Sequence, residues 1–475
     1  MFRRLVSGDV FILQRRLSQS LKCLRLLSCN SVIGSDRGQD LSREERTVPT
    51  ERVKLDHTNT RIGPADDTFL VLTMTNCWLF DQLNELYSIS HPSCLNLDVF
   101  LSNSQVPSRP EKQKRVCKVI LDRFEQQYGQ ELGPLWPSAR AVLLNPGCWQ
   151  YGVMLNRFTA VSDVKQRLQG QGFVRLLPHT DLPHPPSPTQ PHPPSPTQPH
   201  PPSPTQPSSI PHPGPPPPLP PSLQCFIHPS PVHYPSPPHR QGQLKAYYLL
   251  NAASLLPVLA LGVQEGDRVL DLCSAPGGKA LAILQTADPA LLCCNEMDPH
   301  RRDWLAKTLE SFIPQSLSST VTVSNQDGRL FGQSEAGMYD KVLLDAPCSN
   351  DRSWLFSCGT GGDQEGAVRL RDRARLPTLQ TQLLRSALAA VRPGGVVVYS
   401  TCTLSRSENQ EVVEAVLNTC PGVELQDLEE ELALPLQEHF TFTPLGHTPS
   451  LGLLVVPQQG RTWGPMFLSR IKRIH

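Results

Sequence analysis

The 475-residue sequence predicts an α/β fold with a doubly wound, mostly parallel β-sheet. Two short runs, residues 341–344 and 396–399, have the aliphatic and β-branched composition of strands buried on both faces. Each run leads into a polar segment with a cysteine, Cys348 in Asp-Ala-Pro-Cys-Ser and Cys402 in Ser-Thr-Cys-Thr. A third run, residues 268–272, passes through a Pro-Gly-Gly turn into an apolar stretch typical of a helix. Because open α/β sheets bind ligands at the carboxyl ends of their strands, both cysteines are candidate site residues. For any single cysteine, the alternative is a small apolar core residue.

The amino terminus is basic and poor in acids. Residues 1–28 contain five arginines, one lysine, repeated serines and a single acid, Asp9. This composition is typical of a mitochondrial transit peptide, and the apolar stretch of residues 10–13 is too short to cross a membrane. We assign residues 1–30 to a transit peptide, with a basic surface helix as the alternative. Residues 31–65 are polar and weakly patterned, which favours disorder, and we assign residues 31–107 to a variable, largely disordered segment. Residues 69–87 within it are more apolar, and their role stays open.

Helical spacing begins near residue 111. Val116, Ile120, Phe124 and Tyr128 recur every four residues, and Gly129 is expected to end this helix. A second helix is expected over residues 139–144.

A proline-rich tract then interrupts the chain. The octapeptide His-Pro-Pro-Ser-Pro-Thr-Gln-Pro begins at His184, His192 and His200, and the chain has 49 prolines in all. Proline fixes φ and lacks an N–H donor, so this segment cannot build a helix or a sheet. We assign residues 178–240 to a disordered insertion that acts as a spacer. A docking site for a proline-binding domain is the alternative.

The remaining residues contain the sheet. The apolar segment 247–263 is broken by Asn251, Ser254 and Pro257 and is expected in the core. The Asp-Leu-Cys-Ser-Ala-Pro-Gly-Gly-Lys segment, residues 271–279, has the strand, turn and helix order of a cofactor loop. It lacks the glycine patterns that bind dinucleotides or nucleoside triphosphates.

Further strands are expected at residues 291–295 and 321–323, and as a closing antiparallel pair at 453–456 and 466–471. An apolar stripe over residues 379–391 predicts a helix that Pro393 and two glycines end. Ser405 and Glu408 have the spacing of a capping box for a helix that extends to Asn418. The sheet should therefore have seven strands.

Charge and cysteine content limit the possible functions. The formal net charge of +1 gives no overall attraction to nucleic acid, so local basic groups must contact any phosphates. The fourteen cysteines form no C-x-x-C pair, which argues against a zinc site and favours reduced thiols in the cytosol or mitochondrial matrix. The candidate phosphate contacts, each also readable as a solvated surface charge, are Arg301, Arg302, Arg369, Arg371, Arg373, Arg375, Arg470, Lys472 and Arg473.

Four motifs in order resemble the Sun-type (Fmu-like) RNA cytosine-5 methyltransferases, which use S-adenosyl-L-methionine and have the class I methyltransferase fold. The resemblance covers residues 244–475, the expected catalytic domain, and more weakly residues 108–177, expected as a small, mainly helical module beside the RNA cleft. It implies that Glu296 binds the ribose hydroxyls and Asp327 the adenine amine, although a helix cap or turn residue is the alternative for each. It also implies cofactor contacts from Asp345 and from the loop residues Cys273, Ser274, Ala275, Pro276, Gly277, Gly278 and Lys279.

The resemblance implies catalytic roles for three residues. Carbon 5 of cytosine is a poor nucleophile, so a thiolate must first add to carbon 6. In RNA enzymes of this type the attacking thiol lies in the Thr-Cys-Thr segment, which makes Cys402 the nucleophile. Cys348 then assists release, and Asp345 bonds the cytosine edge. Lys279 contacts the base or backbone, or is a solvated lysine.

Details of the motifs resemble a mitochondrial branch that methylates the wobble cytosine of methionine tRNA. These details are residues 247–254 and the Ser349-Asn350-Asp351-Arg352 continuation, whereas Ser274 replaces the commoner alanine. The expected partner is mitochondrial tRNA in the matrix, bound by a monomer without membrane or metal. The alternatives are a mitochondrial rRNA methyltransferase, or an RNA-binding assembly factor that has lost catalysis.

Overall fold

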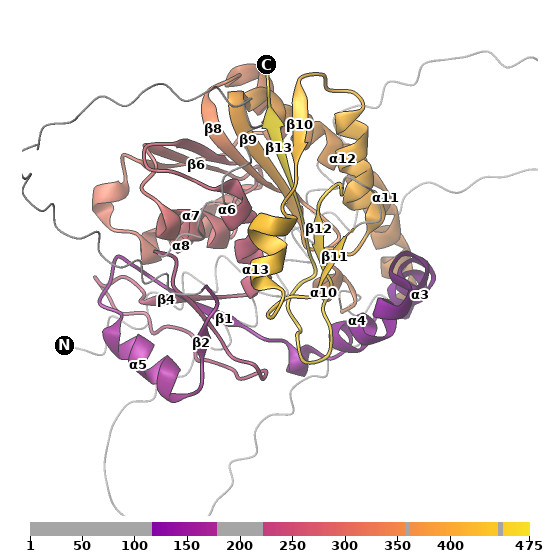
Figure 1. The fold of residues 1–475 in the computed structure, drawn as a ribbon, viewed down its shortest axis with the longest axis horizontal. Helices are drawn as coiled ribbons and strands as arrows, with labels where there is room; N and C mark the ends of the chain where they lie inside the picture. The colour runs from indigo at the N-terminus through magenta and orange to yellow at the C-terminus, as the bar shows by residue number, and fades with distance from the viewer. Residues whose placement is uncertain (1–115, 178–221, 357–361, 445–449) are drawn as a thin grey trace, which may run out of the picture. The chain divides into compact units, whose positions relative to one another are not determined.

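The computed structural model describes residues 116–177, 222–356, 362–444 and 450–475 (Figure 1). The expected transit peptide, the segment 31–107 and the octapeptide repeats lie outside these residues.

The main sheet confirms the predicted fold class. Its five parallel strands are ordered β7-β6-β5-β8-β9, and four antiparallel strands extend it beyond β9. The sheet thus has nine strands where we expected seven, because the short strands β10 and β11 join the closing pair. The strands are β5 (Arg268–Asp271), β6 (Leu291–Asn295), β7 (Val321–Ser324), β8 (Tyr339–Asp345), β9 (Val391–Thr401), β10 (Val423–Gln426), β11 (Phe442–Pro444), β12 (Leu453–Val455) and β13 (Met466–Arg473).

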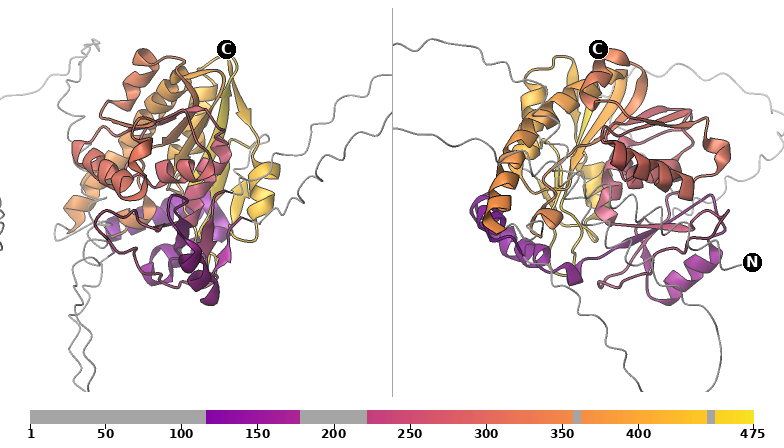
Figure 2. Two further views of the ribbon diagram at one scale, coloured as in Figure 1. Left: turned by 90° about the vertical axis from the view of Figure 1, so that its left-hand side faces the viewer. Right: turned by 180° about the vertical axis from the view of Figure 1, so that it is seen from behind.

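Helices cover both faces of this sheet (Figures 1 and 2). Successive strand residues point to opposite faces, so Leu343 and Val398 pack in one core and Val342 and Val397 in another. The first core includes residues of α6 (Leu256–Leu261), α7 (Gly278–Thr286) and α8 (Pro299–Phe312). The second includes residues of α3 (Lys118–Leu132), α4 (Trp136–Leu143), α11 (Gly362–Ala390) and α12 (Gln410–Leu417). Short helices α9 (Phe331–Ser334), α10 (Asp351–Trp354) and α13 (Leu434–Leu436) complete the set.

A second, antiparallel sheet has the order β2-β3-β1-β4. Its strands are β1 (Gly152–Leu155), β2 (Val174–Arg175), β3 (Cys225–Ile227) and β4 (Tyr247–Leu250), and α5 (Ser162–Gly170) lies between β1 and β2 in sequence. Our assignment of residues 178–240 to a disordered insertion is therefore wrong at β3, which has the buried apolar residues of a central strand. Within residues 116–177, the helices α3, α4 and α5 make up most of the regular structure, as expected of a mainly helical module, and the short strands β1 and β2 join the second sheet.

The helix α3 runs past Gly129 and ends at Leu132, with Gly133, whose φ is +52°, as its C-cap. Glycine inside a helix costs about 0.5–1 kcal/mol, and the additional turn buries Leu132. Side-chain burial thus extends the helix beyond the predicted end. Helix α3 lies beside α11 (Figure 2).

The described helices include none that is both long and apolar enough to pass through a lipid bilayer.

Candidate active site

The two cysteines meet at the carboxyl edge of the main sheet. β8 and β9 are parallel neighbours, with Asp345 opposite Ser400, so the segments that follow them begin side by side. The Sγ atoms of Cys348 and Cys402 are 3.3 Å apart, and the backbone N–H of Cys402 donates to Cys348 Sγ at 3.3 Å. The hydrogen bond with Cys402, together with burial, raises the pKa of Cys348 well above its ordinary value. The arrangement therefore holds a proton on Cys348 beside the second thiol.

Asp345 and Lys279 form an ion pair at the same edge. Lys279 Nζ lies 2.7 Å from Asp345 Oδ2, and Ser400 Oγ donates to Asp345 Oδ1 at 2.9 Å. Burial lowers the pKa of Lys279, but the nearby charges of Asp345 and Cys402 outweigh it and raise the pKa. The Lys279 side chain is only 13% exposed, so it is a largely buried cation at this edge of the sheet, and the alternative of a solvated lysine is wrong.

A pocket opens along the loop between β5 and α7. Gly277 has φ of +104°, a conformation that favours glycine, and a Cβ on Gly278 would lie 3.0 Å from the Tyr248 ring, closer than an ordinary van der Waals contact. The pocket is lined by Tyr248, Leu249, Leu250, Ser254, Asp271, Cys273, Ser274, Ala275, Pro276, Gly278, Lys279 and Asp345.

Asp271 supplies a free acceptor in this pocket. Its Oδ2 accepts from Ser274 Oγ at 2.8 Å, but its buried Oδ1 has no hydrogen-bond partner among the residues that the structure describes. Burial raises the pKa of Asp271 to about 7; the Ser274 bond opposes this effect and the charge of Asp345 adds to it. A carboxylate with an unused oxygen suits the positive amino and sulfonium groups of S-adenosylmethionine, so the pocket fits this cofactor. Our sequence analysis did not name Asp271 as a cofactor contact, although it is the first residue of the predicted 271–279 segment.

Glu296 and Asp327 follow β6 and β7, but neither lines this pocket. Glu296 is buried, accepts from the Asp298 backbone N–H at 3.0 Å and lies 3.3 Å from Arg301 Nη1. Asp327 caps a short 3₁₀-helix by accepting from the Arg329 backbone N–H. Partial burial raises the pKa of Asp327, but the bonds from Arg329 outweigh it, so the net shift is downward. In this structure Asp327 therefore acts as a helix cap, which was the alternative assignment.

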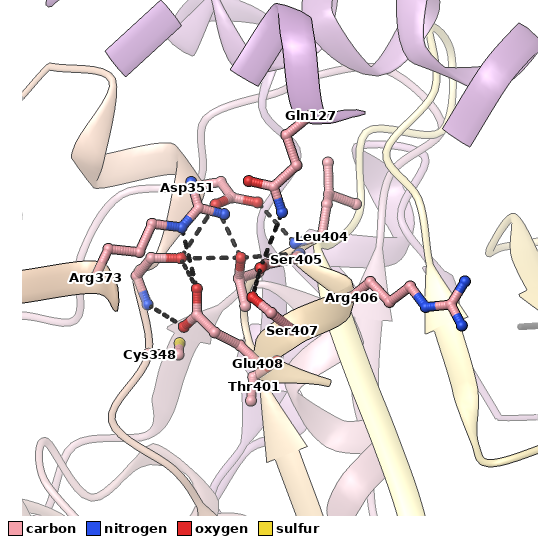
Figure 3. A network of polar contacts seen from close by, with 12 residues as sticks. Gln127, Cys348, Asp351, Arg373, Thr401, Leu404, Ser405, Arg406, Ser407 and Glu408 are labelled. Atoms are coloured by element: carbon pink, nitrogen blue, oxygen red, sulfur yellow. Dashed lines mark hydrogen bonds and ion pairs between the residues drawn. The ribbon is translucent and has the colours of Figure 1, made fainter. Parts of the chain in front are cut away.

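A buried polar network lies beside Cys348, between the segments that follow β8 and β9 (Figure 3). Glu408 is fully buried and accepts from Ser349, Arg373 and Gln380. The predicted capping box is therefore wrong: Ser405 makes no side-chain cap, and its N–H donates to Thr403 Oγ1.

The network also changes the interpretation of the arginines between the two cysteine motifs. Arg369 and Arg373 are buried, whereas Arg371 and Arg375 are exposed. Only the exposed pair remains a candidate for phosphate contact within α11. The helical periodicity of α11 explains why one pair is buried and the other exposed, because residues four apart lie on the same face of a helix.

Among the described residues, no group of three or more His, Cys, Asp and Glu side chains is placed to hold a metal ion. Eight described cysteines are free, but the expectation of reduced thiols throughout is wrong for Cys117, which is disulfide-bonded.

The parallel sheet, the glycine loop beside a fitting pocket and the carboxylate at its floor define a class I methyltransferase. Residues 258–459 match the family model described as 16S rRNA methyltransferase RsmB/F. The chain is 54% identical to a mitochondrial tRNA (cytosine(34)-C(5))-methyltransferase of Danio rerio, over 79% of this chain and 93% of that protein. The mouse protein of the same name is 43% identical, over 78% and 95%.

A bovine 5-cytosine rRNA methyltransferase, NSUN4, is 36% identical over 75% of this chain and 89% of that one. A solved methyltransferase homologue from Pyrococcus horikoshii is 20% identical, with a TM-score of 0.47, over 75% of this chain and 98% of that one. The chain belongs to the Sun-type RNA cytosine-5 methyltransferase family, of which the RsmB/F proteins are part.

Proposed function

We propose that this protein is an S-adenosylmethionine-dependent tRNA (cytosine-5) methyltransferase that modifies the wobble cytosine, position 34, of mitochondrial methionine tRNA. The observation that carries the chemistry is the 3.3 Å approach of the Cys348 and Cys402 thiols beside the Lys279–Asp345 pair. The choice of tRNA is supported by the 54% and 43% identity to enzymes named for cytosine 34 of tRNA.

In the proposed reaction, the Cys402 thiolate adds to carbon 6 of cytosine, and carbon 5 becomes nucleophilic as an enamine. The cofactor supplies the methyl group that carbon 5 receives. Asp345 bonds the cytosine edge and supports protonation at ring nitrogen 3. A base then removes the carbon 5 proton, and the electron pair restores the double bond and expels the Cys402 sulfur. Cys348, which keeps its own proton, assists this release.

The cofactor is proposed to lie against residues 273–279, with Asp271 as an additional anionic contact. Glu296 and Asp327 remain proposed contacts of the ribose and adenine. Their positions after β6 and β7, at the carboxyl edge of the sheet, support this assignment. Asp327 would have to exchange its Arg329 partner for the adenine amine.

The substrate assignment is tested by bisulfite sequencing of mitochondrial RNA from cells that lack this protein. We expect the wobble cytosine of methionine tRNA to lose its methylation, and wild-type protein but not Cys402→Ala to restore it. Loss at a ribosomal RNA cytosine instead would favour the activity named for the NSUN4 relatives. If no cytosine loses methylation, the protein is an RNA-binding factor rather than an enzyme.

The thiol roles are tested by comparing two variants in vitro. Cys402→Ala should abolish methylation and leave cofactor affinity unchanged, because the proposed cofactor contacts do not include this thiol. Cys348→Ala should methylate once and then retain the RNA as an adduct that survives denaturing electrophoresis. An adduct that instead accumulates in Cys402→Ala would reverse the two roles.

We also propose that the protein works in the mitochondrial matrix, on the basis of its basic leader and of the relatives' names.

A further inference from the structure

Two buried carboxylates connect the segments that carry the cysteines. Glu408, after β9, accepts from the backbone N–H of Ser349 at 2.9 Å and from its hydroxyl at 2.7 Å. Asp351, after β8, accepts from the Leu404 N–H at 2.7 Å and from Thr403 Oγ1 at 2.9 Å. Each carboxylate therefore bonds the other segment close to its cysteine, since Ser349 follows Cys348 and Thr403 follows Cys402. Figure 3 shows these contacts crossing between the two segments.

One arginine and one tyrosine complete this network. Arg373 of α11 donates through Nε to Glu408 Oε1 at 3.2 Å and through Nη2 to the Tyr128 hydroxyl at 2.5 Å. The Tyr128 hydroxyl in turn donates to Asp351 Oδ1 at 2.9 Å. Buried charges are tolerated only when they are paired and hydrogen-bonded, so the guanidinium and the hydroxyl are needed to keep both carboxylates in place. We call Tyr128, Asp351, Arg373 and Glu408 the clamp.

One clamp residue comes from a helix that precedes the main domain in sequence. Tyr128 belongs to α3, and two neighbours on this helix also contact the segment after β9. Gln127 donates to Ser405 Oγ at 3.2 Å, and Glu131 accepts from the Arg406 N–H at 3.1 Å. Helix α3 thus holds both segments: Tyr128 bonds Asp351 after β8, and Gln127 and Glu131 bond the segment after β9.

We propose that the clamp is a positioning device that sets the separation and orientation of Cys348 and Cys402 for attack on the base and release from it. The proposal rests on the function proposed above. The clamp acts through the neighbours of the cysteines: Glu408 bonds Ser349, and Asp351 bonds Thr403 and Leu404. Arg373 and Tyr128 hold these two carboxylates. A shift of about 1 Å in a reacting group can cost roughly a hundredfold in rate, so a bond one residue away from each thiol is close enough to control the chemistry.

The sharpest test removes one oxygen atom. Tyr128→Phe deletes the hydroxyl that joins Arg373 to Asp351 and leaves the buried ring in place. We expect a roughly ten- to hundredfold lower rate of single-turnover methylation at saturating RNA and cofactor, with nearly unchanged affinity for both. Tyr339→Phe is the matched control, because this tyrosine, the first residue of β8, is also buried but its hydroxyl bonds Glu335, which follows α9.

A second test isolates the attack by Cys402. In a Cys348→Ala background, adding Glu408→Gln should slow formation of the RNA adduct at least tenfold. The glutamine amide would turn N–H groups toward Ser349, Arg373 and Gln380, which donate to the carboxylate in the wild type, so these hydrogen bonds would be lost. Adduct formation at the parental rate would overturn the proposal. So would equal rate losses in Tyr128→Phe and Tyr339→Phe that follow the loss of melting temperature, since this pattern indicates a general role in stability. If Cys348→Ala alone forms no adduct, the proposed thiol roles fail, and the methylation rate of Tyr128→Phe still decides for or against the clamp.

Discussion

Asp271 illustrates how burial gives one residue a pH-dependent function. Its carboxyl group lies in the pocket with a free oxygen, and burial, opposed by Ser274 and assisted by Asp345, raises its pKa to about 7. The carboxylate form attracts a cationic ligand, whereas the protonated form does not. Ligand affinity should therefore depend on pH near neutrality.

We predict that S-adenosylmethionine binds about tenfold more weakly at pH 6 than at pH 8, because a group with a pKa near 7 is mostly protonated at the lower pH. Isothermal titration calorimetry across this range measures the effect. Asp271→Asn should remove most of the pH dependence, whereas Asp122→Asn, at an exposed position in α3, should leave it unchanged. A profile of Asp271→Asn that runs parallel to the wild type would contradict this assignment.

At this scale, the sequence predicts residues within motifs and misses those that act across the fold. Cys348, Cys402, Asp345 and Lys279 are found because each lies at the end of a recognisable strand or loop. Asp351, Arg373 and Glu408 are charged, and charged residues are mostly exposed, so a sequence alone suggests a solvated surface. Only the packing of α3 and α11 against the strand ends shows that these charges neutralise one another.

At the scale of elements, strand predictions succeed where burial dominates. Four of the five parallel strands are predicted from short apolar runs, β7 is predicted from its β-branched residues although Thr322 and Val323 are exposed, and the helix that begins at Gly278 follows from the loop motif. The predicted end of α3 at Gly129 is wrong, because tertiary burial of Leu132 outweighs the local cost of glycine and the helix continues to that residue. β3 is missed because its three residues follow a long proline-rich tract and their partner, β1, is distant in sequence.

The pairing of β2 with β3 explains how the tract can be accommodated. Val174 pairs with Ile227 and Arg175 with Phe226, so the two ends of the tract return to adjacent strands of one sheet. Leu177 and Leu223, just inside these ends, are both buried. The chain between them thus begins and ends at fixed, neighbouring points.

We predict that deleting the three octapeptides, residues 184–207, leaves melting temperature and methyl transfer nearly unchanged. Closure entropy changes slowly with length, by about 0.6 kcal/mol for each twofold change in the loop. By contrast, Phe226→Ala should cost about 3–5 kcal/mol, because it empties a buried site in β3. Differential scanning calorimetry and a methylation assay measure both variants. A large loss on deletion would show that the repeats take part in folding or in substrate binding.

At the scale of the whole molecule, charge is distributed unevenly. The chain as a whole carries a formal net charge of +1, yet residues 1–28 hold six basic residues and one acid. The remaining sequence is therefore slightly acidic, which is unusual for a protein that must approach a polyanion. Because the basic residues are concentrated in residues 1–28, we infer that this segment serves in targeting rather than in RNA binding.

We therefore predict that residues 1–40, fused to a fluorescent protein, direct it to mitochondria, because an acid-poor segment rich in arginine and serine has the composition of a transit peptide. Confocal microscopy with a mitochondrial marker gives the location, and protease protection in isolated mitochondria distinguishes the matrix from the outer surface. The matched control replaces Arg3, Arg4, Arg15 and Arg16 with glutamine, which keeps length and apolar pattern but removes most of the positive charge. This control should remain in the cytosol. A cytosolic or nucleolar signal from the unaltered fusion would instead show that the leader is an ordinary basic segment, and the proposed mitochondrial RNA substrate would lose an independent support.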